Sequence, residues 1–119
     1  MTESTILKWV RLAAAIKGFV TFRNNVGALK DHNGNVVRYG LTNGSSDLIG
    51  YRSIVIEQKH VGRKLAVFTA IEVKTLRGKL SKGQEIFLMQ VTQAGGIAFI
   101  ARSEDDVERG LGEWLARQT

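Results

Sequence analysis

The stretch "FTAIEVKTLRGKLSKGQ", which runs from Phe68 to Gln84, decides how the rest of the sequence is interpreted. Its first part belongs to the longest apolar run of the chain, "KLAVFTAIEVK" at 64–74, whose β-branched and aromatic residues predict a buried central strand. Glu72 and Lys74 end this run, and side chains two apart on a strand point to the same side. The sequence therefore predicts that a carboxylate and an ammonium meet at the end of a strand.

A helix, a strand and a second helix are predicted to follow. Ser81 and Gln84 form the pattern of a capping box, which indicates a helix from Lys82 to about Ala94. The apolar segment "GGIAFIA" at 95–101 predicts another buried strand. The last segment, "SEDDVERGLGEWLARQ" at 103–118, predicts an amphipathic helix with Ser103 as its cap.

The N-terminal half is predicted to contain a helix, two strands and a hairpin between them. Thr2 or Ser4 can cap the helix, which ends near Lys17 before Gly18. The other predicted elements are a strand at 19–23, a hairpin at 27–40 with Asn33-Gly34 as a two-residue primed turn, and a strand that begins near Asp47. This order of elements predicts an α/β fold, with a mixed central sheet flanked by helices on both faces.

Composition narrows the class of protein. At 119 residues the chain has the size of one domain, which we expect to span 1–119. The absence of cysteine excludes disulfides, zinc ribbons and thiol nucleophiles. No stretch is long and apolar enough to span a bilayer, and Glu3 stands where a signal peptide would be basic. We therefore expect a soluble, cytoplasmic protein.

The net charge suggests the kind of partner. The chain carries a formal charge of +6 and has a pI of about 10.0. Such a small basic domain is a candidate for binding a polyanion, nucleic acid first and an acidic membrane second. The alternative is a charged surface that only keeps the protein soluble.

Two carboxylates and one ammonium are predicted to converge. Asp47 begins one strand, while Glu72 and Lys74 end the next, so antiparallel pairing of these strands would bring all three to one sheet end. Carboxylates that close repel unless a cation lies between them, and hard oxygen ligands suit Mg²⁺ or Mn²⁺. Such a metal can polarise a phosphate oxygen, and Lys74 can stabilise developing negative charge. This is chemistry for phosphodiester hydrolysis; the alternative is a solvated ion pair.

Several separated motifs carry a resemblance to a known family. They are "TES" (2–4), "FRNNVG" (22–27), "GSSDL" (44–48), "IEVK" (71–74), Gln84 and "AGGIAFIARSEDDV" (94–107). In this order they resemble the PD-(D/E)XK nuclease superfamily, and within it the virus-type replication-repair nuclease (VRR-NUC) domain, over nearly the whole chain. The sequence departs from the family at Ser46, where proline is common before the active-site aspartate. Proline shapes that turn and does no chemistry, so the resemblance still implies activity.

The resemblance implies a role for each matching residue. Asp47 and Glu72 would be the metal ligands, with the backbone carbonyl of Val73 as a third, and Lys74 would be the catalytic lysine. Glu3 matches an acid that reaches the metal through water; the alternative is an acid favoured by the dipole of its helix.

Gln84 and the basic residues also match family positions. Gln84 would orient Lys74 or the attacking water, and this role is compatible with its place in a capping box. Arg23 matches an arginine that contacts phosphate, although it can equally be a cation at a strand end. Further phosphate contacts are expected from a glycine-containing basic loop, which can instead be merely solvated; they are Arg77, Lys79 and Lys82.

The implied function is a metal-dependent, structure-selective DNA endonuclease, most similar to Holliday-junction resolvases of DNA repair and recombination. Cutting a four-way junction symmetrically implies a homodimer. One alternative is a nuclease with the same chemistry that acts on flaps or other branched DNA, and another is a DNA-binding module without catalysis. The family suggests a bacterial cell or a phage-infected host. A stripe on the final helix offers either a dimer interface or core packing; it comprises Val107, Leu111, Trp114 and Leu115.

Overall fold

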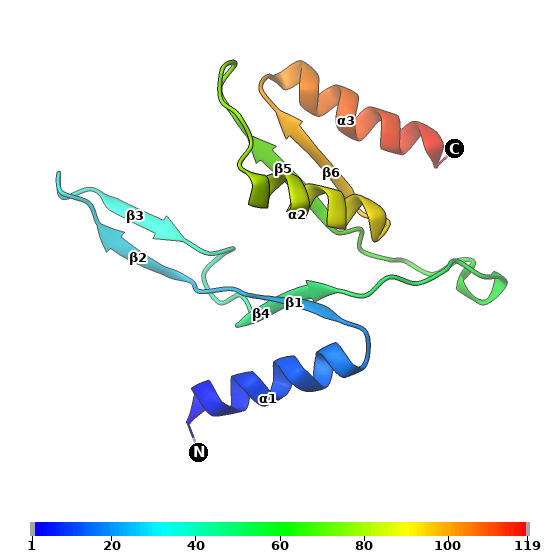
Figure 1. Ribbon diagram of the computed structural model, residues 1–119, viewed down its shortest axis with the longest axis horizontal. Coiled ribbons are helices and arrows are strands. Elements are labelled where there is room, and N and C mark those ends of the chain that lie inside the picture. The colour runs from blue at the N-terminus through cyan, green and yellow to red at the C-terminus, as the bar shows by residue number, and fades with distance from the viewer. Residues whose placement is uncertain (1, 119) are drawn as a thin grey trace. The chain divides into compact units, whose positions relative to one another are not determined.

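The computed structural model describes residues 2–118 and divides into two compact units that meet between Arg52 and Ser53 in the sequence. The first unit contains one helix and four strands: α1 (Glu3–Ile16), β1 (Val20–Arg23), β2 (Gly27–Lys30), β3 (Val36–Tyr39) and β4 (Leu48–Tyr51). The second contains β5 (Thr69–Val73), α2 (Lys82–Gln93), β6 (Ile97–Ala101), α3 (Glu104–Arg117) and a short 3-10 helix, η1 (Gln58–His60) (Figure 1).

In the first unit, α1 packs beside an antiparallel pair of strands. Of the two caps that the sequence allows, Thr2 and Ser4, the structure has Thr2, whose Oγ1 accepts the N–H of Thr5 at 3.2 Å. β1 pairs with β4 antiparallel, with Phe22 opposite Ile49. A side chain ties the helix to this pair: Arg11 Nη2 donates to the carbonyl of Thr21 at 3.3 Å. β4 begins at Leu48, so the predicted start of a strand near Asp47 is confirmed.

The hairpin of β2 and β3 is confirmed, but its predicted turn is wrong. A two-residue primed turn needs a positive φ at Asn33, and in the structure only Gly34, at +82°, has one there. Asp31 and Asn35 close a longer loop through a backbone bond of 2.8 Å. The Asp31 carboxylate also accepts the N–H groups of Asn33 and Asn35, both at 2.9 Å. This side chain therefore stabilises the wider turn.

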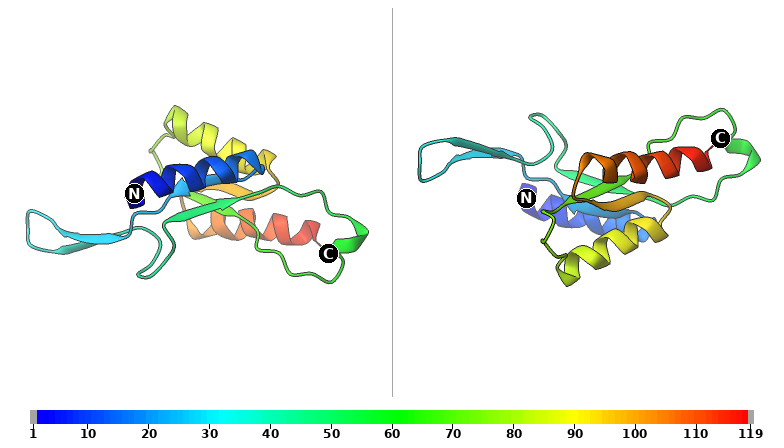
Figure 2. Two further views of the ribbon diagram at one scale, coloured as in Figure 1. Left: turned by 90° about the horizontal axis from the view of Figure 1, so that it is seen from below. Right: turned by 90° about the horizontal axis from the view of Figure 1, so that it is seen from above.

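In the second unit, β5 and β6 are parallel neighbours connected through α2. The register places Glu72 opposite Ile100 and Val73 opposite Ala101. Figure 2 shows α2 and α3 on opposite faces of this strand pair. The start of α2 after the Ser81–Gln84 capping box and the Ser103 cap of α3 are both confirmed. Helices on both faces of a sheet, as predicted, are present in this unit.

The strand predicted over 64–74 is shorter in the structure. β5 begins only at Thr69, because its partner β6 offers just five residues for pairing, and one more bond joins the N–H of Ile97 to the carbonyl of Phe68. β5 is also less enclosed than expected, since its residues alternate between exposed and half-buried. The described residues form three two-stranded sheets, β1–β4, β2–β3 and β5–β6. The single central sheet, the pairing of β4 with β5 and the single-domain organisation stay predictions.

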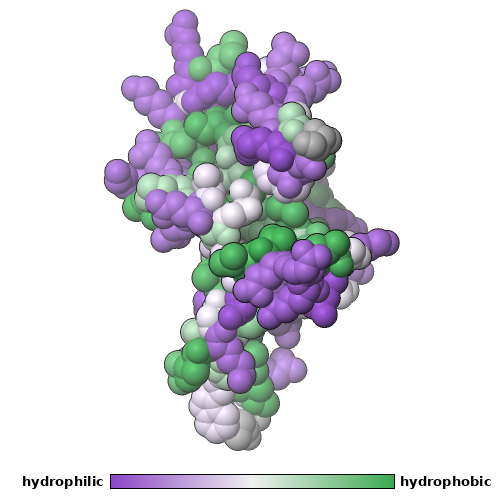
Figure 3. Space-filling model, turned by 90° about the vertical axis from the view of Figure 1, so that its right-hand side faces the viewer, coloured by the Kyte–Doolittle hydropathy of each residue, from purple (hydrophilic) through white to green (hydrophobic). Residues whose placement is uncertain are grey.

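The tightest packing lies where the helices of the second unit meet β6. Val91 on α2 and Ala101 on β6 are buried, with exposed fractions of 1% and 6%. α3 approaches closely at Gly110, where a Cβ atom would lie 2.8 Å from the ring of Phe99. Elsewhere many apolar side chains reach the surface, and Figure 3 shows them among hydrophilic ones on one face.

No helix between residues 2 and 118 is both long and apolar enough to cross a membrane.

Two glycines on α3 provide a paired test of this packing. Gly112→Ala is expected to stabilise the protein by about 0.5–1 kcal/mol, because alanine favours the helix and nothing lies within 4 Å of the new Cβ. Gly110→Ala makes the same gain in helix propensity but pushes a methyl group into Phe99, and is expected to cost about 1–2 kcal/mol net. Urea denaturation of both variants measures the difference. Equal stabilisation by both would contradict the close contact of α3 with β6.

Candidate active site

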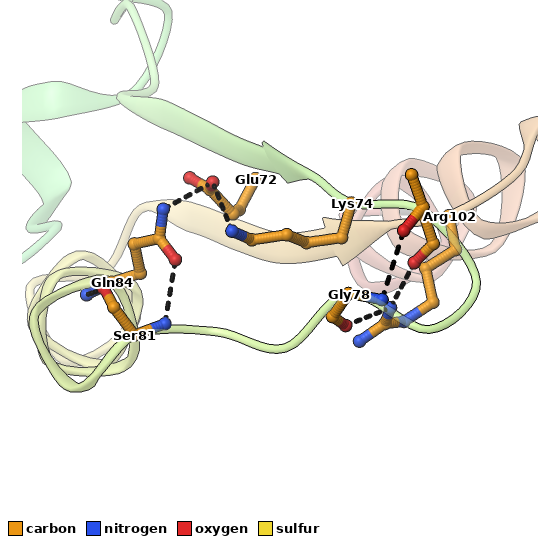
Figure 4. Close-up of polar contacts among 7 residues, drawn as sticks. Glu72, Lys74, Gly78, Ser81, Gln84 and Arg102 are labelled. Atoms are coloured by element: carbon orange, nitrogen blue, oxygen red, sulfur yellow. Dashed lines mark hydrogen bonds and ion pairs between the residues drawn. The ribbon is translucent and has the colours of Figure 1, made fainter.

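Three polar side chains meet at the end of β5. Gln84 Nε2 donates a hydrogen bond to Glu72 Oε1 at 2.9 Å, and Lys74 Nζ lies 3.8 Å from the same oxygen (Figure 4). The alternation of side chains along a strand predicts the approach of Glu72 and Lys74, and it is confirmed. Gln84 contacts Glu72, whereas the sequence suggested that it would orient Lys74 or a water molecule.

Backbone hydrogen bonds hold these side chains in place. The N–H of Lys74 donates to the carbonyl of Ala101 at 3.1 Å, so the pairing with β6 extends one residue beyond the end of β5. Gln84 is fixed by the first turn of α2: its Oε1 accepts the N–H of Ser81 at 2.9 Å, while Ser81 Oγ accepts the N–H of Gln84 at 3.1 Å. One glutamine thus caps a helix and holds a carboxylate; the capping box is confirmed, and the role of Gln84 toward Lys74 or a water molecule stays a prediction.

The Glu72 carboxylate keeps binding capacity in this arrangement. The exposed fractions of the Glu72 and Lys74 side chains are 30% and 23%, so water partly screens the pair. Their 3.8 Å separation is too long for a strong hydrogen bond. Oε1 accepts from Gln84, and Oε2 accepts no hydrogen bond from residues 2–118. An ionised carboxylate has about four acceptor positions, so Glu72 can still bind a cation or a proton donor.

Asp47 and Glu3 lie together in the first unit. Both line a pocket of about 340 Å³ formed by the first turns of α1 and the residues around the start of β4. The other lining residues are Ile6, Leu7, Val10, Ser46 and Leu48. The Asp47 carboxylate makes no hydrogen bond or ion pair within the described part of the chain. Glu3 on the first helix and Asp47 before β4 thus line one cavity, while their roles at a metal stay predictions.

Asn24 holds the loop that leads to Asp47, and the sequence interpretation missed it. Its Nδ2 donates to Ser45 Oγ and to the carbonyl of Ser46, both at 2.8 Å, and its Oδ1 accepts the N–H of Leu41 at 3.0 Å. Its own N–H donates to the carbonyl of Asp47 at 2.8 Å. Nothing in "FRNNVG" distinguishes Asn24 from Asn25, because the bonded partners are 17 to 23 residues away in the sequence.

The predicted phosphate-binding cations differ in what they contact. Arg23 ends β1, and its Nε donates to Asn25 Oδ1 at 2.8 Å. Lys82 begins α2 and lies 3.8 Å from Glu85 in an exposed ion pair. Arg77 and Lys79 are exposed in the loop between β5 and α2, and neither makes a hydrogen bond or ion pair with residues 2–118. These two therefore remain available to an anion.

The predicted metal ligands are chemically suitable. Asp47, Glu72 and the carbonyl of Val73 offer only oxygen, the donor type that Mg²⁺ and Mn²⁺ prefer. Among residues 2–118, no three acidic, histidine or cysteine side chains are grouped closely enough to hold an ion by themselves. Mg²⁺ is usually bound by one or two carboxylates together with water and substrate oxygens. The assignment of these ligands stays a prediction.

Comparison with known protein families matches residues 17–105 to the VRR-NUC domain. The matched segment includes β1, the loop before Asp47, the end of β5, and Gln84. Neither the comparison with curated proteins nor that with solved structures found a match.

Removal of the Asn24 side chain tests how the Asp47 loop is held. Asn24→Ala is expected to destabilise the protein by about 1–3 kcal/mol, because it removes three hydrogen bonds in a half-buried place. The Leu41 amide should also exchange its hydrogen faster. Asn25→Ala is the matched control and should change stability by less than about 0.5 kcal/mol, since Asn25 bonds only to exposed Arg23. Similar exchange rates in both variants would show that Asn24 does not hold the loop.

Proposed function

The chain belongs to the VRR-NUC family of nuclease domains, and we propose that it is a metal-dependent, structure-selective DNA endonuclease that cleaves four-way junctions. The observation that carries this proposal is the convergence of Glu72, Lys74 and Gln84 at one end of β5. The carboxylate can bind a cation and the ammonium can stabilise an anion, and phosphodiester hydrolysis requires both of these actions. The amide holds the carboxylate in place.

Lys74 supplies positive charge where the reaction develops negative charge. Its ammonium has three donors and lies in a half-buried place, where electrostatic stabilisation is stronger than in bulk water. We propose that it donates to the attacking water or to a non-bridging phosphate oxygen. Gln84 takes no part in proton transfer in this proposal; its amide holds Glu72 Oε1, the carboxylate oxygen that faces the Lys74 ammonium.

Asp47, Glu72 and the carbonyl of Val73 would hold the divalent metal, with Glu3 contributing through water. When bound, Mg²⁺ or Mn²⁺ would polarise a phosphate oxygen and make a bound water more acidic. The support for Glu3 is the pocket that it shares with Asp47. The support for the other ligands is the match of their motifs to the family and the oxygen donors that they provide.

DNA would be bound mainly through its backbone. The net charge of +6 and the free cations Arg77 and Lys79 support phosphate contacts, to which Arg23 and Lys82 would add. The sequence contains no helix-turn-helix or zinc-finger pattern, so we propose that DNA shape, rather than base sequence, determines where the enzyme cuts. A twofold dimer would match the pseudo-twofold symmetry of a four-way junction.

The apolar stripe on α3 bears on the proposed dimer. On α3, Val107, Leu111 and Trp114 are half-buried, and this helix packs on β6 within the same chain. Leu115 is the more exposed member of the stripe, at 59%. The stripe thus serves core packing at least in part, which leaves Leu115 and its surroundings for a partner subunit.

The catalytic assignment is tested by substitution. Lys74→Ala and Asp47→Asn are expected to lower the cleavage rate of labelled junctions at least about 100-fold, because each removes charge that acts in the transition state. DNA affinity should stay within a few-fold, since phosphate neutralisation elsewhere supplies most of it. Lys64→Ala, at an exposed lysine before β5, is the matched control and should cleave normally. Cleavage should also stop in EDTA and return with Mg²⁺ or Mn²⁺.

If Lys74→Ala cleaved at nearly the wild-type rate, the active site would be elsewhere. Full cleavage in excess chelator would exclude the metal. DNA retention without cleavage under any metal condition would support the non-catalytic binding module instead.

Substrate choice is tested by comparing a four-way junction, a flap and a linear duplex of the same sequence. We expect paired nicks in opposed strands of the junction and little cleavage of the duplex. Sedimentation at micromolar concentration should show a dimer. A monomer that cuts flaps faster than junctions would overturn the junction specificity but not the nuclease chemistry.

A further inference from the structure

The basic loop, defined as residues 75–81 between β5 and α2, is held by the side chain of Arg102, which directly follows the end of β6. Arg102 Nη1 donates to the carbonyls of Thr75 at 2.5 Å and Gly78 at 2.6 Å, and more weakly to that of Leu76 at 3.4 Å. Figure 4 shows the guanidinium of Arg102 turned toward Gly78 and the loop. A single cation thus contacts three carbonyls of the segment that follows Lys74.

The backbone of Arg102 is itself held in place. It follows Ala101, which is buried and lies opposite Val73 in the strand pairing. Its backbone N–H donates to Asp106 Oδ2 at 2.8 Å, in the first turn of α3, and the other oxygen of Asp106 accepts from Arg109. Because β6 and α3 both anchor it, the guanidinium can determine where the loop lies.

The capping box holds the basic loop at Ser81, and between Thr75 and Leu80 Arg102 supplies most of the hydrogen bonds that hold it. Within the loop, the N–H of Gly78 bonds to the carbonyl and to Oγ1 of Thr75, both at 3.1 Å. Arg77 and Lys79 flank Gly78 and are exposed, and neither has a partner among residues 2–118. The two cations most available to an anion thus stand on either side of a carbonyl that Arg102 holds.

We propose that Arg102 orders the basic loop for binding the DNA backbone, and that it is a positioning residue rather than a phosphate contact. The role of the loop toward DNA rests on the proposed function; the ordering of the loop does not. Arg102 is half-buried and its Nη1 is engaged by loop carbonyls, whereas Arg77 and Lys79 are exposed and have no partner among residues 2–118, so we assign the phosphate contacts to these two. A loop ordered in advance loses less conformational entropy on binding, which raises affinity without adding a charge contact.

Trypsin provides a direct measure of loop order, because it cuts after arginine and lysine. In the native protein, Arg102→Gln and Arg102→Lys should both be cleaved after Arg77 and Lys79 about tenfold faster than wild type. Lysine keeps the charge, but its ammonium is one bond closer to the backbone than Nη1, so it cannot reach both carbonyls. Arg117→Gln, in the last turn of α3, removes the same charge and should leave loop cleavage unchanged.

DNA binding distinguishes positioning from contact. For branched DNA at several salt concentrations without divalent metal, both Arg102 variants should bind about tenfold more weakly with the wild-type salt slope. Arg77→Gln should reduce that slope by about one, as loss of a phosphate contact does. A phosphate contact from Arg102 would instead give a smaller slope in Arg102→Gln and near-normal binding in Arg102→Lys.

Each result has one interpretation. Wild-type loop cleavage in Arg102→Lys would overturn the proposal, and so would a reduced salt slope in Arg102→Gln. If Arg102→Gln does not fold, Arg102→Lys decides alone. If the wild-type chain does not bind DNA, the proposed function fails, while the trypsin result still tests whether Arg102 orders the loop.

Discussion

The parallel pairing of β5 with β6 is the constraint on which the second unit depends. Parallel strands end at the same edge of a sheet, so the residues that follow β5 and β6 are neighbours. The bond from the N–H of Lys74 to the carbonyl of Ala101 continues this pairing beyond both strands. Lys74 and Arg102 therefore lie at one edge, although Arg102 is 27 residues away in the sequence from Thr75, the first residue whose carbonyl it bonds. The proposed catalytic lysine and the proposed loop-ordering arginine share this edge because of backbone pairing.

Amides do much of the positioning at both acidic segments. Gln84 holds the Glu72 carboxylate, and Asn24 holds the loop that ends at Asp47. A neutral donor orients a carboxylate or a carbonyl and leaves a negative charge in place. A cation in close contact would orient a carboxylate and also neutralise it. Neither acid is in a tight ion pair within the described residues. Both thus keep the charge that the proposed binding of a divalent metal requires.

The Gln84 side chain also couples the formation of α2 to the candidate site. The Gln84 side chain caps α2 through Ser81 and bonds Glu72 with its other end. Loss of the cap would loosen the first turn of α2, and that turn carries the amide that fixes the carboxylate. The basic loop lies between these two anchors, with Arg102 at one end and the capping box at the other. Its two free cations are thus carried by a segment whose backbone is held at both ends.

Local patterns in the sequence determined the elements and the shared face of Glu72 and Lys74, because a strand's alternation and a helix's cap depend only on residues a few positions apart. The helix caps at Thr2, Ser81 and Ser103 and the order of helices and strands could be predicted for this reason. The start of β5 at Thr69 could not, since strand length depends on a partner 28 residues later. The turn at Asp31 was missed because a side chain competed with the usual backbone turn. Only the tertiary structure determined what Asn24, Gln84 and Arg102 bind, because a polar side chain has many possible partners and the fold decides which ones come within reach.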